Sequence, residues 1–192
     1  LTNVSGYHRI NERLHNLTVK VNSTNSVSLV SCDFLGNTRA ELEQGYDTEA
    51  VNMRGEASII VCTMNLEYYL VENLGTGYGP DNSSAHQKQR VKVSKALATI
   101  NADIFGFVEI EQGQSALAEI ATDLTQKTGR KFTYINDGGS PYSSYTKSGF
   151  VYCSDKVRPY GQLRENNTGV KQRKKTQAFQ EISTGEVFLF SV

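Results

Sequence analysis

Two stretches of the chain, 58–65 and 103–109, carry apolar residues at both odd and even positions. This pattern is typical of strands that are buried on both faces. Between them, apolar residues recur at helical spacing and predict a helix over 85–100, with Val93 and Ile100 facing a sheet. The hydrophobic pattern therefore predicts a strand–helix–strand unit as the organising element of the chain.

The pattern continues with a second helix and then with strands alone. Leu117 and Leu124 belong to the apolar stripe of this helix, and Gly129 is placed as a cap just past its end. The segment between Cys153 and Thr176 is expected to be a loop. From residue 57 onward the predicted order is strand, helix, strand, helix and then four strands. Those four later strands are expected at 132–135, 149–153, 176–182 and 186–192.

Residues 1–56 have a different character from the domain expected at 57–192. Alternating apolar positions over 17–21 and 27–34, separated by turn-forming residues, predict a hairpin with one buried face. The polar stretch 37–54 is expected to be a loop or linker. We interpret residues 1–56 as a β-rich extension, or as the remnant of a preceding β domain with its linker.

Composition sets few limits on function. The 20 Lys and Arg residues balance the 20 Asp and Glu residues, so nucleic-acid binding would need local clusters of charge. No apolar run approaches the roughly 20 residues that a membrane span requires. The 3 cysteines, an odd number, give no disulfide framework, and their apolar surroundings are typical of buried thiols.

Polar residues end both of the buried strands. Asn65 ends the first strand and Glu109 ends the second, so both are expected at a rim of the sheet, where α/β proteins often hold ligands and metals. Glu67 and Glu111 are expected to point to the opposite face. A Glu after a buried strand is more often a solvated residue or the partner of a helix cap, so its position alone leaves both interpretations open.

Asn65, Glu109 and the sequence Ala-Asp-Ile at 102–104 together resemble the endonuclease/exonuclease/phosphatase superfamily, which has the DNase-I-like fold. The resemblance is strongest to its bacterial nuclease-like branch. It implies an α/β (α+β) fold in which two β sheets are flanked by helices as a four-layer sandwich. The chain would cover the first half of that catalytic domain, preceded by a short all-β extension.

The resemblance also implies a divalent cation at the strand ends. Mg²⁺ is expected, with Mn²⁺ or Ca²⁺ as alternatives, because phosphoryl transfer needs positive charge on the phosphoryl group and an activated water. Glu109 would be the charged ligand and Asn65 a neutral one. Two protein ligands from this half of the domain suffice, because Mg²⁺ usually keeps several of its waters.

A basic stretch at 171–175 supplies further candidate residues. The family has an Arg shortly before a strand that ends in Phe, and Arg173 fits that position as a third catalytic residue. The two lysines after it are expected to be more exposed than Arg173, and could instead discourage aggregation at a sheet edge. The residues expected to contact a substrate are Tyr145, Lys147, Arg173, Lys174 and Lys175.

The resulting hypothesis is a metal-dependent phosphoesterase, foremost a nuclease, that acts on nucleic acid or another phosphate ester. A lipid or inositol phosphate phosphatase or phosphodiesterase of the same fold is the nearest alternative, and a non-catalytic α/β binding module is the alternative from another class. The resemblance implies an extracellular, periplasmic or surface-exposed bacterial protein that is monomeric at full length.

Two consequences concern the chain as given. The family needs a "G-D-x-N" and an "S-D-H" stretch further along the domain, and residues 1–192 contain neither, so we expect these residues alone to be inactive. Phe105, Phe107, Phe188 and Phe190 are expected on a sheet face that only the rest of the domain would cover. Residues 1–192 alone should therefore be poorly stable or aggregate.

Overall fold

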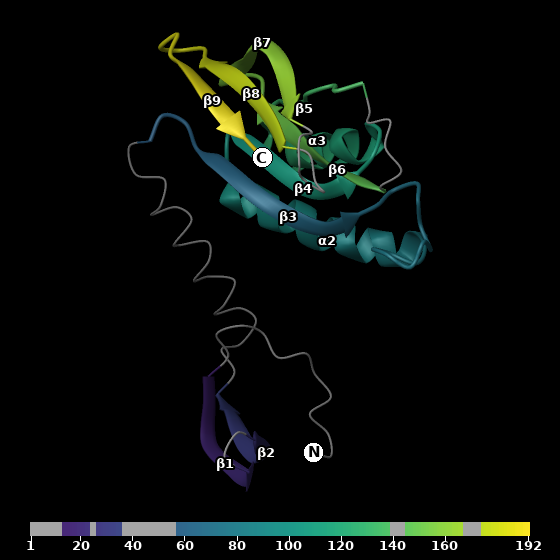
Figure 1. Cartoon of the computed structure of the whole chain (residues 1–192). Coiled ribbons are helices and arrows are strands. Elements are labelled where there is room, and N and C mark those ends of the chain that lie inside the picture. Colours follow the sequence, from purple (N-terminus) through teal and green to yellow (C-terminus); the bar gives the residue numbers. More distant parts are fainter. Residues whose placement is uncertain (1–12, 24–25, 36–56, 139–144, 167–173) are drawn as a thin grey trace. The chain divides into compact units, whose positions relative to one another are not determined.

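The computed structural model describes residues 13–23, 26–35, 57–138, 145–166 and 174–192 (Figure 1). The chain divides into two compact units, Leu1–Met53 and Arg54–Val192, and each is described by itself. In the first unit β1 (Arg13–Ser23) and β2 (Ser26–Leu35) pair antiparallel. The predicted hairpin is therefore confirmed, and the expected linker lies outside the described residues.

The second unit has a central sheet with the strand order β3-β4-β6-β5. β3 and β4 run parallel, while β6 runs antiparallel to both of its neighbours. β3 starts later than predicted, at Val61. It also ends later, because its pairing with β4 resumes at Tyr69 beyond an irregularity. The four strands are β3 (Val61–Tyr69), β4 (Ile104–Glu111), β5 (Phe132–Tyr134) and β6 (Thr146–Cys153).

Both predicted helices are confirmed, as α2 (Ser83–Ile100) and α3 (Ser115–Thr128). The side-chain oxygen of Asn82 accepts a hydrogen bond from the Ala85 N–H at 3.0 Å and so caps the start of α2. α3 ends at Gly129, whose φ of 71° is the left-handed conformation that a glycine cap adopts without strain. The chain is thus returned to the sheet directly after each helix.

A second sheet, with the strand order β7-β8-β9, corrects the sequence prediction. β7 lies in the segment that was expected to be a loop. It was missed because only Val157 is buried and only Leu163 is half-buried along it, so an apolar alternation is lacking. The strands are β7 (Val157–Asn166), β8 (Lys174–Glu181) and β9 (Val187–Ser191), all antiparallel.

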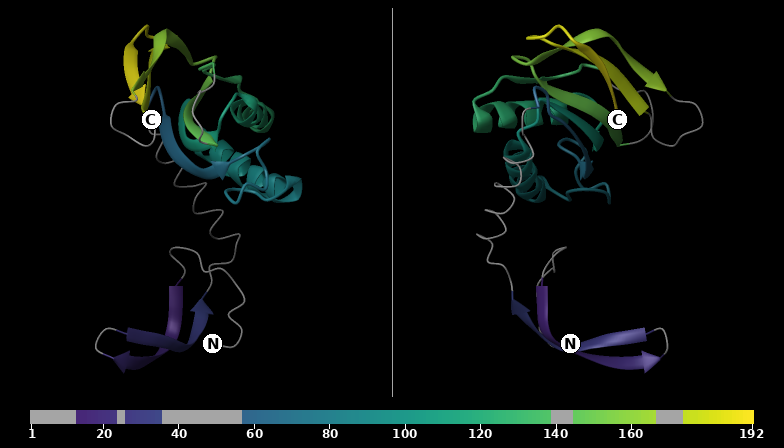
Figure 2. Two further views of the ribbon diagram at one scale, coloured as in Figure 1. Left: turned by 45° about the vertical axis from the view of Figure 1, so that its right-hand side comes forward. Right: turned by 90° about the vertical axis from the view of Figure 1, so that its left-hand side faces the viewer.

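The second unit has three layers. Helices α2 and α3 cover one face of the central sheet, and the β7-β8-β9 sheet packs against the other face (Figures 1 and 2). Gly106 lets the second sheet approach closely, because a Cβ there would lie 3.1 Å from Cζ of Phe190. The core between the two sheets is centred on Ile104, Phe150, Val157 and Phe179.

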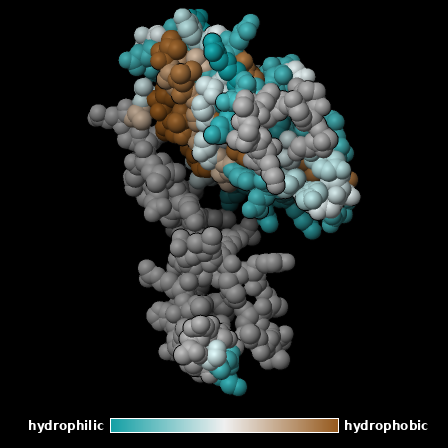
Figure 3. Space-filling model, viewed as in Figure 1, coloured by the Kyte–Doolittle hydropathy of each residue, from teal (hydrophilic) through white to brown (hydrophobic). Residues whose placement is uncertain are grey.

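The expectation of an uncovered sheet face is wrong. Phe105 and Phe107 are fully buried on the helix side, while Phe188 and Phe190 are half-buried between the two sheets. The second sheet already begins within these residues and covers the face in question. Apolar surface gathers instead on the β8–β9 hairpin (Figure 3), where Leu189 is 75% exposed.

Among the described residues, no helix combines the length and the hydropathy that crossing a membrane would need.

Candidate functional site

Asn65 and Glu109 lie at the same rim of the central sheet, near the carboxyl ends of β3 and β4. We call this rim the edge. In the parallel pair β3–β4, Asn65 is the Cα partner of Val108, the residue that directly precedes Glu109. The prediction that the two residues lie on adjacent strands near one rim is therefore confirmed, although β3 continues to Tyr69 and β4 to Glu111. That their carboxamide and carboxylate groups converge stays a prediction.

The backbone at this edge departs from regular strand geometry. Glu109 has a φ of 59°, and Glu67 and Tyr68 have φ values of 50° and 60°. The register of β3–β4 and that of β4–β6 both shift at this point. Left-handed backbone costs a non-glycine residue roughly 1–2 kcal/mol, and such strain with bulged pairing is concentrated at functional sites, where it re-aims side chains.

Asn65 helps to shape this irregular backbone. Its side-chain oxygen accepts a hydrogen bond from the Glu67 N–H at 2.8 Å, which is the geometry of an Asx turn. Asn65 itself is exposed. A carboxamide oxygen has two lone pairs, so this bond leaves one acceptor position for another ligand.

The Glu109 side chain differs from the other acidic groups at this edge. The residue is half-buried, and no described residue donates a hydrogen bond to its carboxylate. The described residues contain no group of three or more His, Cys, Asp or Glu side chains that could hold a metal. One carboxylate and one carboxamide oxygen still fit a hard cation such as Mg²⁺, which keeps waters for its remaining positions.

Glu111 has the opposite environment, although it lies only two residues further along β4. It is fully buried, and its carboxylate accepts hydrogen bonds from the backbone N–H groups of Val71, Glu72 and Asn73 at 2.7–3.1 Å. The Asn73 side chain adds a further bond at 2.8 Å. Glu111 therefore anchors the loop that leaves β3, a role that the sequence pattern did not reveal.

A second anchor holds the end of β3 against the helices. The Tyr69 hydroxyl donates to Glu119 of α3 at 2.7 Å, and His86 of α2 contacts the same carboxylate oxygen at 2.9 Å. Burial, together with the neighbouring Glu119 carboxylate, raises the pKa of the Tyr69 hydroxyl far above its usual range. Arg90 of α2 pairs with both Glu119 and Asp123 of α3, so it ties the two helices together.

Two of the expected substrate contacts lie in a buried ion cluster. Asp137 accepts hydrogen bonds from Lys147 and Gln114 at 2.7 Å each, and from Lys175 of β8 through its other oxygen. The side chains of Lys147, Asp137 and Lys175 are 3%, 4% and 2% exposed. The expectation that Lys175 is exposed is therefore wrong, because its ammonium group ties the second sheet to the loop after β5.

Burial alone would raise the pKa of the Asp137 carboxyl group. Hydrogen bonds from Lys147, Lys175 and Gln114 outweigh this effect and hold the pKa well below its usual range. Burial lowers the pKa of the Lys147 ammonium group, and the charge of Lys175 lowers it further against the opposing effect of Asp137. The cluster is thus a carboxylate that is held charged by two ammonium groups.

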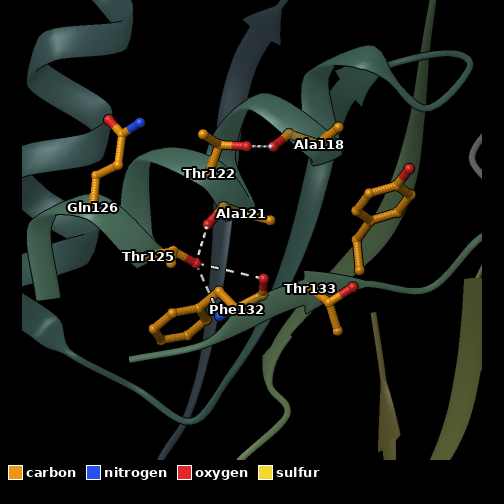
Figure 4. Close-up of a pocket in the computed structure, with 8 residues that line it drawn as sticks. Ala118, Ala121, Thr122, Thr125, Gln126, Phe132 and Thr133 are labelled. Atoms are coloured by element: carbon orange, nitrogen blue, oxygen red, sulfur yellow. Dashed lines mark hydrogen bonds between the residues drawn. The ribbon is translucent and has the colours of Figure 1, made fainter. Parts of the chain in front are cut away.

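The other expected residues have different positions. Lys174, at the start of β8, is exposed, and Tyr145 is 41% exposed just before β6. Arg173 lies outside the described residues. A pocket of about 370 Å³ between α3 and β5 is separate from the strand ends (Figure 4). The hydroxyls of Thr122 and Thr125 in that pocket bond to helix carbonyls, and its lining has no charged group, so it is no candidate for phosphate chemistry.

Comparison with known proteins gives fold-level likenesses only. No family model matches the sequence, and no curated protein matches it. An endonuclease/exonuclease/phosphatase family protein from Bacteroides thetaiotaomicron is 17% identical, with 69% of this chain and 49% of that chain covered and a TM-score of 0.42. ANGEL2, a 2′,3′-cyclic phosphatase in complex with adenosine-2′,3′-vanadate, is 11% identical, with 69% and 40% covered and a TM-score of 0.46.

TDP2 from C. elegans is 14% identical, with 81% of this chain and 41% of that chain covered and a TM-score of 0.42. The chain spans half or less of the length of these solved structures. One of them is described as an endonuclease/exonuclease/phosphatase family protein, the superfamily that the sequence resembles. Likenesses of this degree carry no residue roles over to this chain.

Proposed function

We propose that residues 57–192 supply the metal-binding half of a divalent-metal-dependent phosphoesterase, foremost a nuclease that hydrolyses phosphodiester bonds. The proposal rests on the environment of Glu109. Glu109 is a half-buried carboxylate without a described hydrogen-bond donor, in a left-handed conformation, next to the point where Asn65 is the last residue of β3 before its irregular end. A carboxylate in such a place is stabilised by a cation.

The residues divide into those that would contact the metal and those that position them. Glu109 and Asn65 would hold Mg²⁺ or Mn²⁺, which supplies positive charge to a phosphoryl group and lowers the pKa of a bound water. Glu111 and Tyr69 position the end of β3, and so act through the backbone. Lys174 and Tyr145, both exposed, are the described residues that we propose for substrate contact, together with Arg173 from the sequence.

Lys147 and Lys175 contribute in a different way. Both are bound to Asp137 inside the structure, so they would add positive potential and rigidity behind the edge without touching the substrate. A lipid or inositol phosphate phosphatase of the same fold would use the same metal site, so an activity screen on nucleic acid and inositol phosphates separates these substrates. Such a screen needs the protein with its complete catalytic domain.

Metal binding can be measured on the chain itself, with Mn²⁺ as the probe and electron paramagnetic resonance as the readout of free Mn²⁺. Glu109→Gln should weaken binding by about tenfold or more, because it removes the one charged ligand. Glu67→Gln is the matched control, since it removes the same charge from an exposed residue at the same edge.

Asn65→Asp keeps the acceptor of the Asx turn and adds charge, so it should retain Mn²⁺, while Asn65→Ala should lose affinity. Equal Mn²⁺ affinity in the wild type, Glu109→Gln and Glu67→Gln would contradict the proposal. It would leave Glu109 as a solvated residue at the end of a strand.

A further inference from the structure

Three tyrosines from separate segments meet beside the candidate metal site. Tyr68 is the second-last residue of β3, Tyr78 lies in the loop before α2, and Tyr145 precedes β6. The rings of Tyr68 and Tyr78 are stacked, with centroids 5.0 Å apart and an interplanar angle of 19°. Tyr145 extends this row, with its centroid 6.5 Å from that of Tyr78. We call these three residues the tyrosine row.

The loop is built to place Tyr78 on Tyr68. Gly79 has a φ of 65°, and a Cβ at this position would lie 2.4 Å from the carbonyl oxygen of Tyr68. Only glycine allows the backbone to approach Tyr68 so closely. The stack of Tyr78 on Tyr68 therefore depends on a residue that contributes no ring.

The tyrosine row lies at the same sheet edge as Glu109. Tyr69, next to Tyr68, is the pairing partner of Ile110, which directly follows Glu109. On the other side, the Tyr145 carbonyl accepts a hydrogen bond from the N–H of Gln112 at 3.0 Å, just past the end of β4. The row thus spans the ends of the same strands that carry the candidate metal ligands.

Exposure argues that the row does more than clamp the loop. Tyr78 is 54% exposed and Tyr145 is 41% exposed, whereas Tyr69, which does anchor this strand end, is 1% exposed with its hydroxyl bonded. A clamp gains its stability from burial, and these two rings leave much of their area in water. Large aromatic faces that stay in water beside a site are available to a planar ligand.

The need for unpaired bases indicates which planar ligand. Glu67 and Glu72 are exposed near the row, and Glu109 adds a third carboxylate, so these side chains offer the phosphates of a nucleic acid no attraction and the rings have to supply it. Stacking on aromatic rings needs bases that are unpaired, which a single strand offers and a duplex does not.

We propose that Tyr68, Tyr78 and Tyr145 form a stacking platform for the unpaired bases of single-stranded nucleic acid, next to the Asn65–Glu109 edge. This proposal deepens the phosphoesterase function and rests on it for its catalytic meaning. It names the substrate class as a single strand. Tyr78 and Tyr145 are the specificity-determining residues, because they are the most exposed members of the row.

Fluorescence anisotropy of a short labelled DNA single strand tests the platform, with a chelator present so that metal binding plays no part. The single strand should bind more tightly than an abasic strand of the same length and charge, and more tightly than a duplex. Tyr78→Ala and Tyr145→Ala should each weaken binding roughly fivefold or more, in line with the loss of one stacked base. Tyr78→Phe and Tyr145→Phe should bind like the wild type.

Two further variants separate stacking from general damage. Tyr160→Ala removes an equally exposed ring, 55% exposed on β7 and outside the row, and should have no effect. Gly79→Ala keeps every ring but displaces Tyr78 from Tyr68, so it should weaken binding of the single strand. Circular dichroism confirms that each variant is folded before its binding is compared.

The outcomes distinguish this proposal from the metal site. Equal binding of the abasic strand and the base-containing strand, or an equal loss in Tyr160→Ala and Tyr78→Ala, would overturn the stacking platform whatever Mn²⁺ does. Normal single-strand binding by a chain that fails to bind Mn²⁺ would retain the platform and overturn only the metal site.

Discussion

The two ends of the β3–β4 pair both carry carboxylates, but these differ in burial and in hydrogen bonding. At the amino end, Asp103 is 1% exposed, accepts a hydrogen bond from the Ile60 N–H at 2.8 Å and pairs with Arg130. At the carboxyl end, Glu109 is half-buried in a left-handed conformation, and no described residue donates to its side chain. One end of the strand pair is thus held by a hydrogen bond and an ion pair, and the other has a carboxylate in left-handed backbone, which we propose is a metal ligand.

Asp103→Ala should have the largest effect on stability. It leaves Nη2 of Arg130 and the Ile60 N–H without their acceptor, and breaking a pair of this kind costs about 3 kcal/mol or more when it is buried. Urea denaturation should show a lower midpoint with an unchanged slope. Glu109→Ala should leave the midpoint near that of the wild type. A similar large loss in both variants would remove the contrast between the two edges.

The Asp137 carboxylate should also stabilise the fold, and its contribution should depend on pH. The pKa of Asp137 is lower in the folded chain than in an unfolded chain, where Asp titrates at about 3.9. A depressed pKa stabilises the fold above the unfolded value, and this stabilisation is lost as pH falls through the folded pKa. Asp137→Asn should therefore be less stable than the wild type at pH 7.

The difference between Asp137→Asn and the wild type should shrink progressively below about pH 4. Denaturant titrations repeated from neutral to acidic pH measure it. Glu181 is the internal control. Hydrogen bonds from Thr184, Ser183 and Ser58 also lower its pKa, with burial opposing them, and its contribution to the pH dependence is the same in Asp137→Asn and the wild type. A stability difference that is constant across the whole pH range would show that Asp137 acts by packing and not by charge.

The sequence predicted the scaffold well because packing has a periodic signature. Both helices, the β1–β2 hairpin and the placement of Asn65 and Glu109 on adjacent strands near one rim followed from that signature. β7 was missed because an exposed edge strand has no apolar face to mark it.

The environment of each charged side chain could not be predicted in the same way. Glu109 and Glu111 are both acidic and two residues apart, yet a bulge between the regular strand and the loop sends one to the edge and the other to buried N–H groups. Lys175 looked like part of a solvated basic stretch, and only the pairing of the second sheet with the loop after β5 brings it to Asp137. Such long-range contacts have no local signal, so the strain at Glu109 and the tyrosine row appear only in the folded chain.

The most direct measurement is the unfolding free energy of Glu109→Gly, with and without Mn²⁺. Glycine adopts a φ of 59° without strain, so we expect a gain of about 0.5–1 kcal/mol in chelator, reduced from the full strain by the greater freedom of glycine in the unfolded chain. Val108→Gly, the neighbouring control at a residue without a positive φ, should lose stability. Mn²⁺ should stabilise the wild type and leave Glu109→Gly unchanged, because only a protein that binds the ion gains stability from it. A loss of stability in Glu109→Gly together with an unchanged gain from Mn²⁺ would contradict a strained metal ligand at this edge.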